Sequence, residues 1–71
     1  MTRLQAQVII ALADHDLNIA EAARSLHYHR NTLVYHIDMI RDETGKDPNK
    51  FYDLSELLPI ARAALAMNER R

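Results

Sequence analysis

The sequence predicts an all-α fold, a small bundle of four to five helices that contains a helix-turn-helix. Apolar residues recur at the three- and four-residue spacing of helices along most of the chain. Glycine occurs once, at Gly45, and no Asn-Gly or Asp-Gly pair marks a β-hairpin. With 71 residues and no linker-like segment, residues 1–71 are expected to form a single domain.

The first two helices are predicted over about residues 2–13 and 19–26. The first has an apolar face made of Leu4, Val8, Ala11 and Leu12. It ends at "DHDLN", because Asp and Asn favour turns. Asn18 is the expected N-cap of the second helix, with Glu21 three residues later as its capping partner. The second helix should bury Ile19, Ala22, Ala23 and Leu26, and its alanine pair allows another helix to approach closely.

The third helix is predicted over about residues 30–44, after the break at "LHYH". His29 occupies the N-cap position, and Leu33, Ile37 and Ile40 should face the core. Gly45 is expected to end the helix in the left-handed conformation that favours glycine.

The segment "KDPNKFYD" is expected to form a loop or a single turn before the last helix. Pro48 suits a first-turn position and Phe51 should fill the core beside it. The last helix is predicted to begin near Asp53 or Ser55, with "DLSE" as a capping box. Its apolar face would consist of Leu54, Leu57, Leu58, Ala61 and Leu65.

Pro59 lies inside this last apolar pattern. A proline past the first turn removes a backbone hydrogen bond and clashes with the carbonyl four residues earlier. The helix is therefore expected either to start late, near Leu57, or to kink at Pro59. The final four residues, "NERR", are expected to fray.

Composition excludes several classes of protein. Cysteine is absent, so the chain has neither a disulfide nor a thiolate metal site. No apolar run approaches the roughly 18 residues of a membrane span, and "MTRLQAQVII" does not have the shape of a signal peptide. We therefore expect a cytoplasmic protein with no membrane partner. An enzyme is not expected, because no Gly-rich phosphate loop and no paired acid and base are present.

A short helix, a turn and a longer helix form the helix-turn-helix pattern, in which the second helix enters the major groove of DNA. The net charge of −1 argues mildly against a nucleic-acid partner. However, residues 22–37 contain Arg24, Arg30 and three histidines and no carboxylate. Opposite the buried stripe, the third helix would expose Asn31, Tyr35 and Asp38, flanked by Arg30 and Val34.

The predicted partner is double-stranded DNA, and the side chains offer suitable chemistry. Arg30 can pair with guanine, Asn31 with adenine, and Val34 can touch a thymine methyl group. His29 and Thr32, with the backbone amides that open the helix, suit phosphate. Tyr35 is either exposed to DNA or laid along the first helix to cover the core. The candidate DNA-binding residues are His29, Arg30, Asn31, Thr32, Val34 and Tyr35.

The stretch "EAARSLHYHRNTLVYHIDMIRDETGKDP" resembles the C-terminal helix-turn-helix domain of the PucR/CdaR family of bacterial transcription regulators. "HRNTL", the "TG" pair eleven residues after Leu33, and "DP" followed by "F-x-D-L" underlie the likeness, which covers nearly the whole chain. It implies a DNA-binding output domain, with the helix-turn-helix at about residues 18–44, behind upstream sensor domains that this chain lacks. It also implies a cytoplasmic, nucleoid-associated location. The helix-turn-helix also resembles the Fis type, in which a dimer presents two recognition helices, so a homodimer is an expected partner.

The chain departs from the family pattern at three places. The family tends to continue "NTLRYRL", whereas Val34 and His36 replace the two basic residues here. Asp38 adds an acid to the exposed face, and Pro59 replaces a residue that continues the last helix. Fewer phosphate-neutralising charges predict weaker binding with a flatter salt dependence.

Two alternatives compete with a DNA-binding role. His27, His29 and His36 could in principle hold zinc. However, seven residues of helix separate His29 from His36 by about 10 Å, so no metal and no cofactor are expected. The more serious alternative is a helical dimerisation or protein-interaction module with weak or no DNA binding. It is favoured by an excess of apolar residues in the last helix, namely Leu57, Leu58, Ile60, Ala64 and Leu65.

Overall fold

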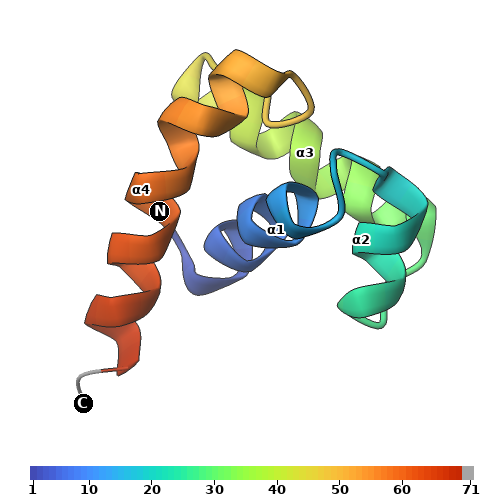
Figure 1. Cartoon of the computed structure of the whole chain (residues 1–71), viewed down its shortest axis with the longest axis horizontal. Coiled ribbons are helices and arrows are strands. Elements are labelled where there is room, and N and C mark those ends of the chain that lie inside the picture. Colours follow the sequence, from blue (N-terminus) through green and yellow to red (C-terminus); the bar gives the residue numbers. More distant parts are fainter. Residues whose placement is uncertain (70–71) are drawn as a thin grey trace.

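A computed structural model describes residues 1–69, and side chains as far as Met67. Within this range the fold is all-α, with α1 at Arg3–Asp14, α2 at Ile19–Ser25, α3 at Arg30–Thr44 and α4 at Phe51–Glu69. The central helix is α1, which packs against each of the other three, while α2 packs on α3 (Figure 1). The predicted bounds of the first three helices are confirmed to within a residue.

The core lies between α1 and the helices around it. Fully buried Ile9 and Leu12 of α1 meet Leu33 and Ile40 of α3 and Leu57 of α4 in one cluster. The predicted stripe of α3 is confirmed, since Leu33, Ile37 and Ile40 are all buried. Ala22 and Ala23 of α2 are also buried, as expected, whereas Leu4, Ile19, Leu26, Leu58 and Leu65 are only half-buried.

Local sequence accounts for the ends of α1. The Thr2 hydroxyl accepts a hydrogen bond from the Gln5 N–H at 3.1 Å, and the Gln5 side chain accepts from the Thr2 N–H at 3.0 Å. This reciprocal capping box satisfies two amide groups that the helix itself cannot pair. At the other end Asp16 and Leu17 adopt positive φ angles of 53° and 66°. The Leu17 N–H reaches back to the Leu12 carbonyl at 2.8 Å, which closes the helix and turns the chain toward α2.

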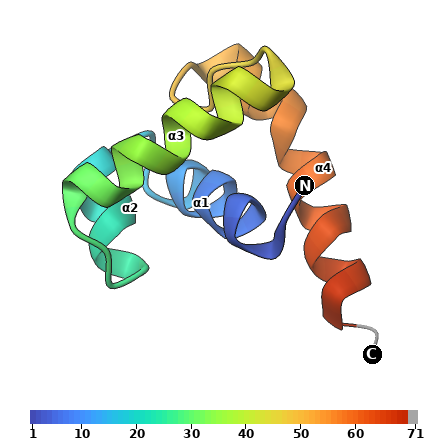
Figure 2. The same cartoon turned by 180° about the vertical axis from the view of Figure 1, so that it is seen from behind.

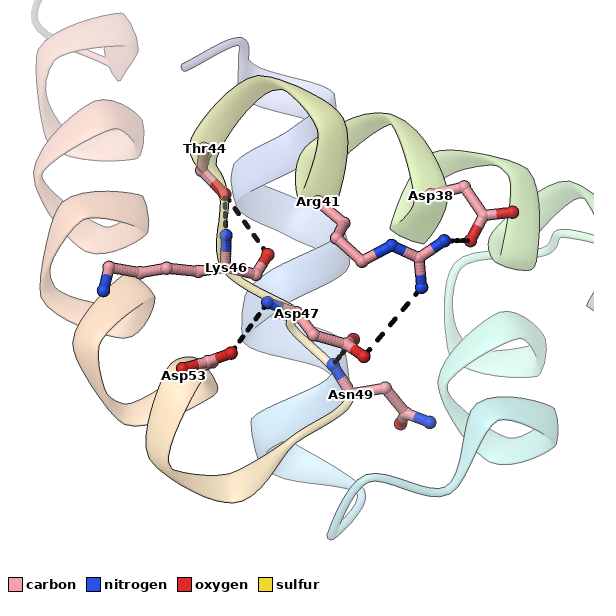
Figure 3. Close-up of polar contacts among 7 residues, drawn as sticks. All are labelled: Asp38, Arg41, Thr44, Lys46, Asp47, Asn49 and Asp53. Carbon is pink, nitrogen blue, oxygen red and sulfur yellow. Dashed lines mark hydrogen bonds and ion pairs between the residues drawn. The ribbon is translucent and has the colours of Figure 1, made fainter.

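The connection between α3 and α4 is held by polar contacts (Figure 3). Gly45 ends α3 with a φ of 74°, as predicted. The Thr44 hydroxyl accepts from the Lys46 N–H at 3.1 Å, and the Asp47 carboxylate accepts from the Asn49 N–H at 2.9 Å. Lys46 forms an ion pair with Glu56 of α4, and this contact raises the pKa of Lys46.

The predicted start of the last helix is wrong. α4 begins at Phe51, so Asp53 lies in its first turn and "DLSE" is not a capping box. The Asp53 carboxylate instead accepts the Asp47 N–H of the loop at 3.0 Å, and the Ser55 hydroxyl donates to the Phe51 carbonyl at 2.9 Å. Asp53 therefore joins the loop to the first turn of the helix.

The predicted core role of Phe51 and the predicted first-turn position of Pro48 are also wrong. Phe51 is 66% exposed and stacks edge-on against the exposed Tyr52. The buried side chain of this segment is Pro48, which precedes the helix instead of occupying its first turn. A compact proline ring takes the place that the larger phenylalanine was expected to fill.

Pro59 lies inside α4, and the helix continues on both sides of it. A late start near Leu57 is therefore wrong. Figure 1 shows that α4 changes direction along its length, between its first turns and the segment that runs down the side of α1. Pro59 has no N–H for the Ser55 carbonyl, and a kink of this origin is the expected consequence.

The remaining part of α4 runs to Glu69. The fraying expected of "NERR" does not apply to residues 68–69 and otherwise falls on residues 70–71, outside the described range. Between residues 1 and 69, no helix is long and apolar enough to cross a membrane.

Candidate nucleic-acid interface

The helix-turn-helix is formed by α2, the turn at residues 26–29, and α3. Figure 2 shows these two helices meeting on the side of α1 that is opposite α4. The Tyr28 N–H donates to the Ala23 carbonyl at 2.8 Å, and the His27 N–H donates to the Arg24 carbonyl at 3.1 Å. These are the two bonds of a Schellman motif, which needs a left-handed residue between them. That residue is His27, with a φ of 60°.

His29 begins α3, as predicted. Its backbone is extended, and its Nδ1 accepts a hydrogen bond from the Asn31 N–H at 3.1 Å. An imidazole nitrogen that accepts a hydrogen bond holds no proton, so in the neutral ring the proton lies on Nε2. The exposed His29 side chain therefore caps the helix with one nitrogen and offers a donor with the other.

Five of the six predicted site residues have exposed side chains. His29, Arg30, Asn31 and Thr32 are exposed in the first turn, and Tyr35 is 60% exposed one turn later. Val34 is half-buried. The alternative that Tyr35 covers the core is therefore wrong. Five of the six lie in the N-terminal half of α3, and His29 is its N-cap.

The first turn of α3 carries a positive charge, whereas the last turns of this helix carry acidic residues. Arg30 lies in the first turn, where no acidic residue accompanies it, and it has no ion-pair partner within residues 1–67. A cation at a helix N-terminus is disfavoured by the helix dipole, by about 0.3–1 kcal/mol at an exposed site. Arg30 therefore gains no stabilisation from the helix dipole and is free to bind an anion.

Two acidic residues of the helix-turn-helix form ion pairs with arginine. Glu21 binds Arg24 at 2.8 Å on α2, and Asp38 binds Arg41 at 2.8 Å on α3. Arg41 also lies 3.9 Å from the Asp47 carboxylate (Figure 3). The acid that Asp38 adds to the exposed face of α3 is thus partly neutralised within the same helix.

An aromatic contact joins the turn to α3. The Tyr28 and His36 ring centroids are 5.8 Å apart, and those of Tyr35 and His36 are 5.5 Å apart. This group is not evident from the sequence, because the eight-residue separation of Tyr28 and His36 crosses the turn. Only the turn geometry could have indicated it.

The three histidines of the helix-turn-helix occupy separate environments. His27 is exposed in the turn, His29 caps α3, and His36 contacts the two tyrosines. Among the described residues, no group of three or more His, Asp or Glu side chains could hold a metal ion.

Comparison with known proteins identifies the family. No curated protein and no solved structure matches the sequence. The family model of the PucR C-terminal helix-turn-helix domain matches residues 5–66, from the first turn of α1 to the last turns of α4. Helix-turn-helix domains of this kind bind DNA in transcription regulation. The chain belongs to the PucR C-terminal helix-turn-helix domain family.

Proposed function

We propose that this chain is the DNA-binding domain of a bacterial transcription regulator, with α3 in the major groove. The observation that supports this most is the N-terminal half of α3. It exposes an arginine without an ion-pair partner, an asparagine and a tyrosine opposite a fully buried stripe. Together with the family match, this favours DNA over other partners.

The charge distribution favours one orientation in the groove. The exposed acids Asp42 and Glu43 lie in the C-terminal part of α3, and Asp38 lies between the two ends. Phosphates repel these carboxylates, so α3 enters with its N-terminus and tilts its C-terminus away from the backbone. Helices of helix-turn-helix proteins generally contact bases with their N-terminal residues.

Within that orientation, each candidate residue has a role. Arg30 pairs with guanine, Asn31 with adenine, and Val34 and Tyr35 provide apolar contacts to base edges. His29, through its Nε2–H, and Thr32 contact phosphate together with the amides of the first turn. Because Val34 and His36 replace basic residues of the family pattern, few phosphates are neutralised and the salt dependence is shallow.

The deciding experiment titrates the 71-residue chain against random-sequence duplexes and duplexes selected from that pool, over a salt series. Binding that weakens with salt and favours the selected duplexes is expected. A folded chain that binds neither pool at low salt would contradict the proposal.

Single substitutions identify the site. Arg30→Ala and Asn31→Ala should each lower discrimination by about 1–3 kcal/mol at one base pair. Arg3→Ala is the matched control, since Arg3 is likewise an exposed arginine in the first turn of a helix, α1. If Arg30→Ala and Arg3→Ala affect binding equally, α3 does not read the DNA.

A homodimer is a second proposal, supported by the outer surface of α4. A shallow groove along this helix is lined only by apolar side chains, those of Met1, Pro59, Ile60, Ala63, Ala64 and Met67. Ile60 is 51% exposed and Met67 is 75% exposed. A helix with apolar residues on its inner and outer faces is typically covered on both. Here α1 covers the inner face.

A second copy of this chain fits that surface. Glu56 and Arg62 lie three residues on either side of Pro59 and are exposed. In an antiparallel pair of α4 helices centred near Pro59, Arg62 of each copy lies level with Glu56 of the other, which already forms an ion pair with Lys46 of its own chain. α2 and the N-terminal part of α3 lie on the side of α1 away from the later turns of α4 (Figures 1 and 2), so the N-termini of both α3 helices stay accessible.

Sedimentation equilibrium tests the dimer. Ile60→Asp should convert it to a monomer with unchanged helix content, whereas Tyr52→Asp, at an 81% exposed position outside the groove, should not. A wild-type chain that remains monomeric at high micromolar concentration would refute this interface. It would leave the DNA-binding proposal standing, with a single half-site per molecule.

A further inference from the structure

The contact between Tyr28, His36 and Tyr35, the aromatic triad, links the core to the exposed face of α3. Tyr28 is half-buried against the core cluster, and its backbone N–H donates a hydrogen bond to the Ala23 carbonyl at 2.8 Å. The His36 ring is tilted by 33° against the Tyr28 ring. The Tyr35 ring also contacts His36, and the planes of these two rings form an angle of 67°. Exposure increases along the series, from two half-buried rings to an exposed one.

Helix geometry makes the last contact informative. Consecutive residues of a helix point about 100° apart and do not normally face each other. Ring centroids 5.5 Å apart therefore require that Tyr35 or His36 leans toward its neighbour. Edge-to-face aromatic pairs at this separation are attractive. The Tyr35 ring is consequently held by His36 beside the turn, although most of its surface is open to solvent.

We propose that His36 is a positioning residue that fixes Tyr35 in one orientation, so that Tyr35 determines sequence specificity in the major groove. His36 is half-buried, and its ring contacts the rings of both tyrosines. The inference rests on the proposed DNA-binding function and assigns a role to two residues, Tyr28 and His36, outside the candidate site. It also explains how the chain functions with histidine at this position: the imidazole supplies order where a basic residue would supply charge.

The expected effect follows from the cost of ordering a side chain. Immobilising a mobile side chain at an interface costs about 0.5–1.5 kcal/mol, which corresponds to about two- to tenfold in affinity. A tyrosine that is already held does not incur this loss on binding. The gain applies only to sites where the ring finds its matching base edge, so it increases specific binding over non-specific binding.

The first test measures the free protein. Three-bond couplings about the Tyr35 χ1 bond and contacts between Tyr35 and His36 ring protons should report one rotamer in the wild type. His36→Ala should give averaged couplings, and His36→Phe, which retains an aromatic ring, should restore the single rotamer. Averaged couplings in the wild type, or couplings that His36→Ala leaves unchanged, would overturn the proposal without any reference to DNA.

The second test is a double-mutant cycle on binding. His36→Ala should lower the ratio of specific to non-specific affinity about two- to tenfold, with unchanged non-specific binding and an intact fold by circular dichroism. In a Tyr35→Ala background the same substitution should have no further effect, because His36 acts through Tyr35. Additive losses would overturn the positioning role. Absence of all DNA binding would refute the proposed function and with it the role of Tyr35 in specificity, while the coupling measurement still decides whether His36 orders the ring.

Discussion

His29 combines two roles in one side chain, and substitution can separate them. Aspartate is among the strongest N-caps and its charge favours the helix dipole. His29→Asp should therefore maintain or raise the free energy of unfolding, whereas His29→Ala should lower it by about 0.5–2 kcal/mol. Both should weaken DNA binding, His29→Asp more strongly because a carboxylate repels phosphate. Urea denaturation and DNA titration of the same samples measure the two effects, and affinity that follows stability would show that His29 acts only as a cap.

His27 presents the opposite case, a residue whose backbone matters more than its side chain. Its φ of 60° is unfavourable for most residues, and most of all for β-branched ones. His27→Val should destabilise the domain by about 1–2 kcal/mol, the scale of the left-handed penalty. His27→Asn should be close to neutral, because asparagine tolerates this conformation and the histidine side chain is exposed. Equal stability of the two variants in thermal unfolding would contradict this account of the turn.

Residues in regular helices and at the caps of α3 could be predicted from the sequence, whereas the contacts across the turn could not. The bounds of α3, its His29 cap and the burial of Leu33, Ile37 and Ile40 follow from local pattern alone. The exposure of five of the six site residues follows from that same stripe. The left-handed His27 and the aromatic triad depend on contacts across the turn. No periodicity in the sequence reports those contacts.

The same distinction applies to whole elements, most clearly to α4. Its apolar stripe was predictable, but its first residue was not, because Asp53 could equally cap a helix or bind the loop before it. In the structure the Asp53 carboxylate accepts the Asp47 N–H, and Pro48 rather than Phe51 is buried beneath the loop. Asp53 is therefore engaged by the loop rather than by a cap, and local capping rules alone gave the wrong first residue.

Substitution of Pro59 measures how the kink in α4 affects the stability of the domain. Pro59→Ala restores a backbone donor to the Ser55 carbonyl and removes a ring that is exposed in the structure. The free energy of unfolding should rise by about 1–3 kcal/mol, since proline in a helix interior costs about 3 kcal/mol relative to alanine. Denaturant unfolding measures the change. A loss of stability would mean that the bend itself is needed to pack both Leu54 and Ala61 against α1.

At the scale of the whole molecule, the arrangement around α1 predicts cooperative unfolding. Leu12→Ala at a fully buried position of α1 should cost about 2–5 kcal/mol. That is a large part of the net stability of a 71-residue chain, about 4–10 kcal/mol at 0.05–0.15 kcal/mol per residue. Ile60→Ala on the outer face of α4 should cost far less in the monomer.

The chain has no tryptophan, and its tyrosines lie in the helix-turn-helix and in α4, so tyrosine fluorescence and circular dichroism follow both parts. Coincident transitions are expected because α2, α3 and α4 all pack on α1. A separate transition for α4 would mean that the helix-turn-helix folds without it, and that α4 serves the dimer rather than the core.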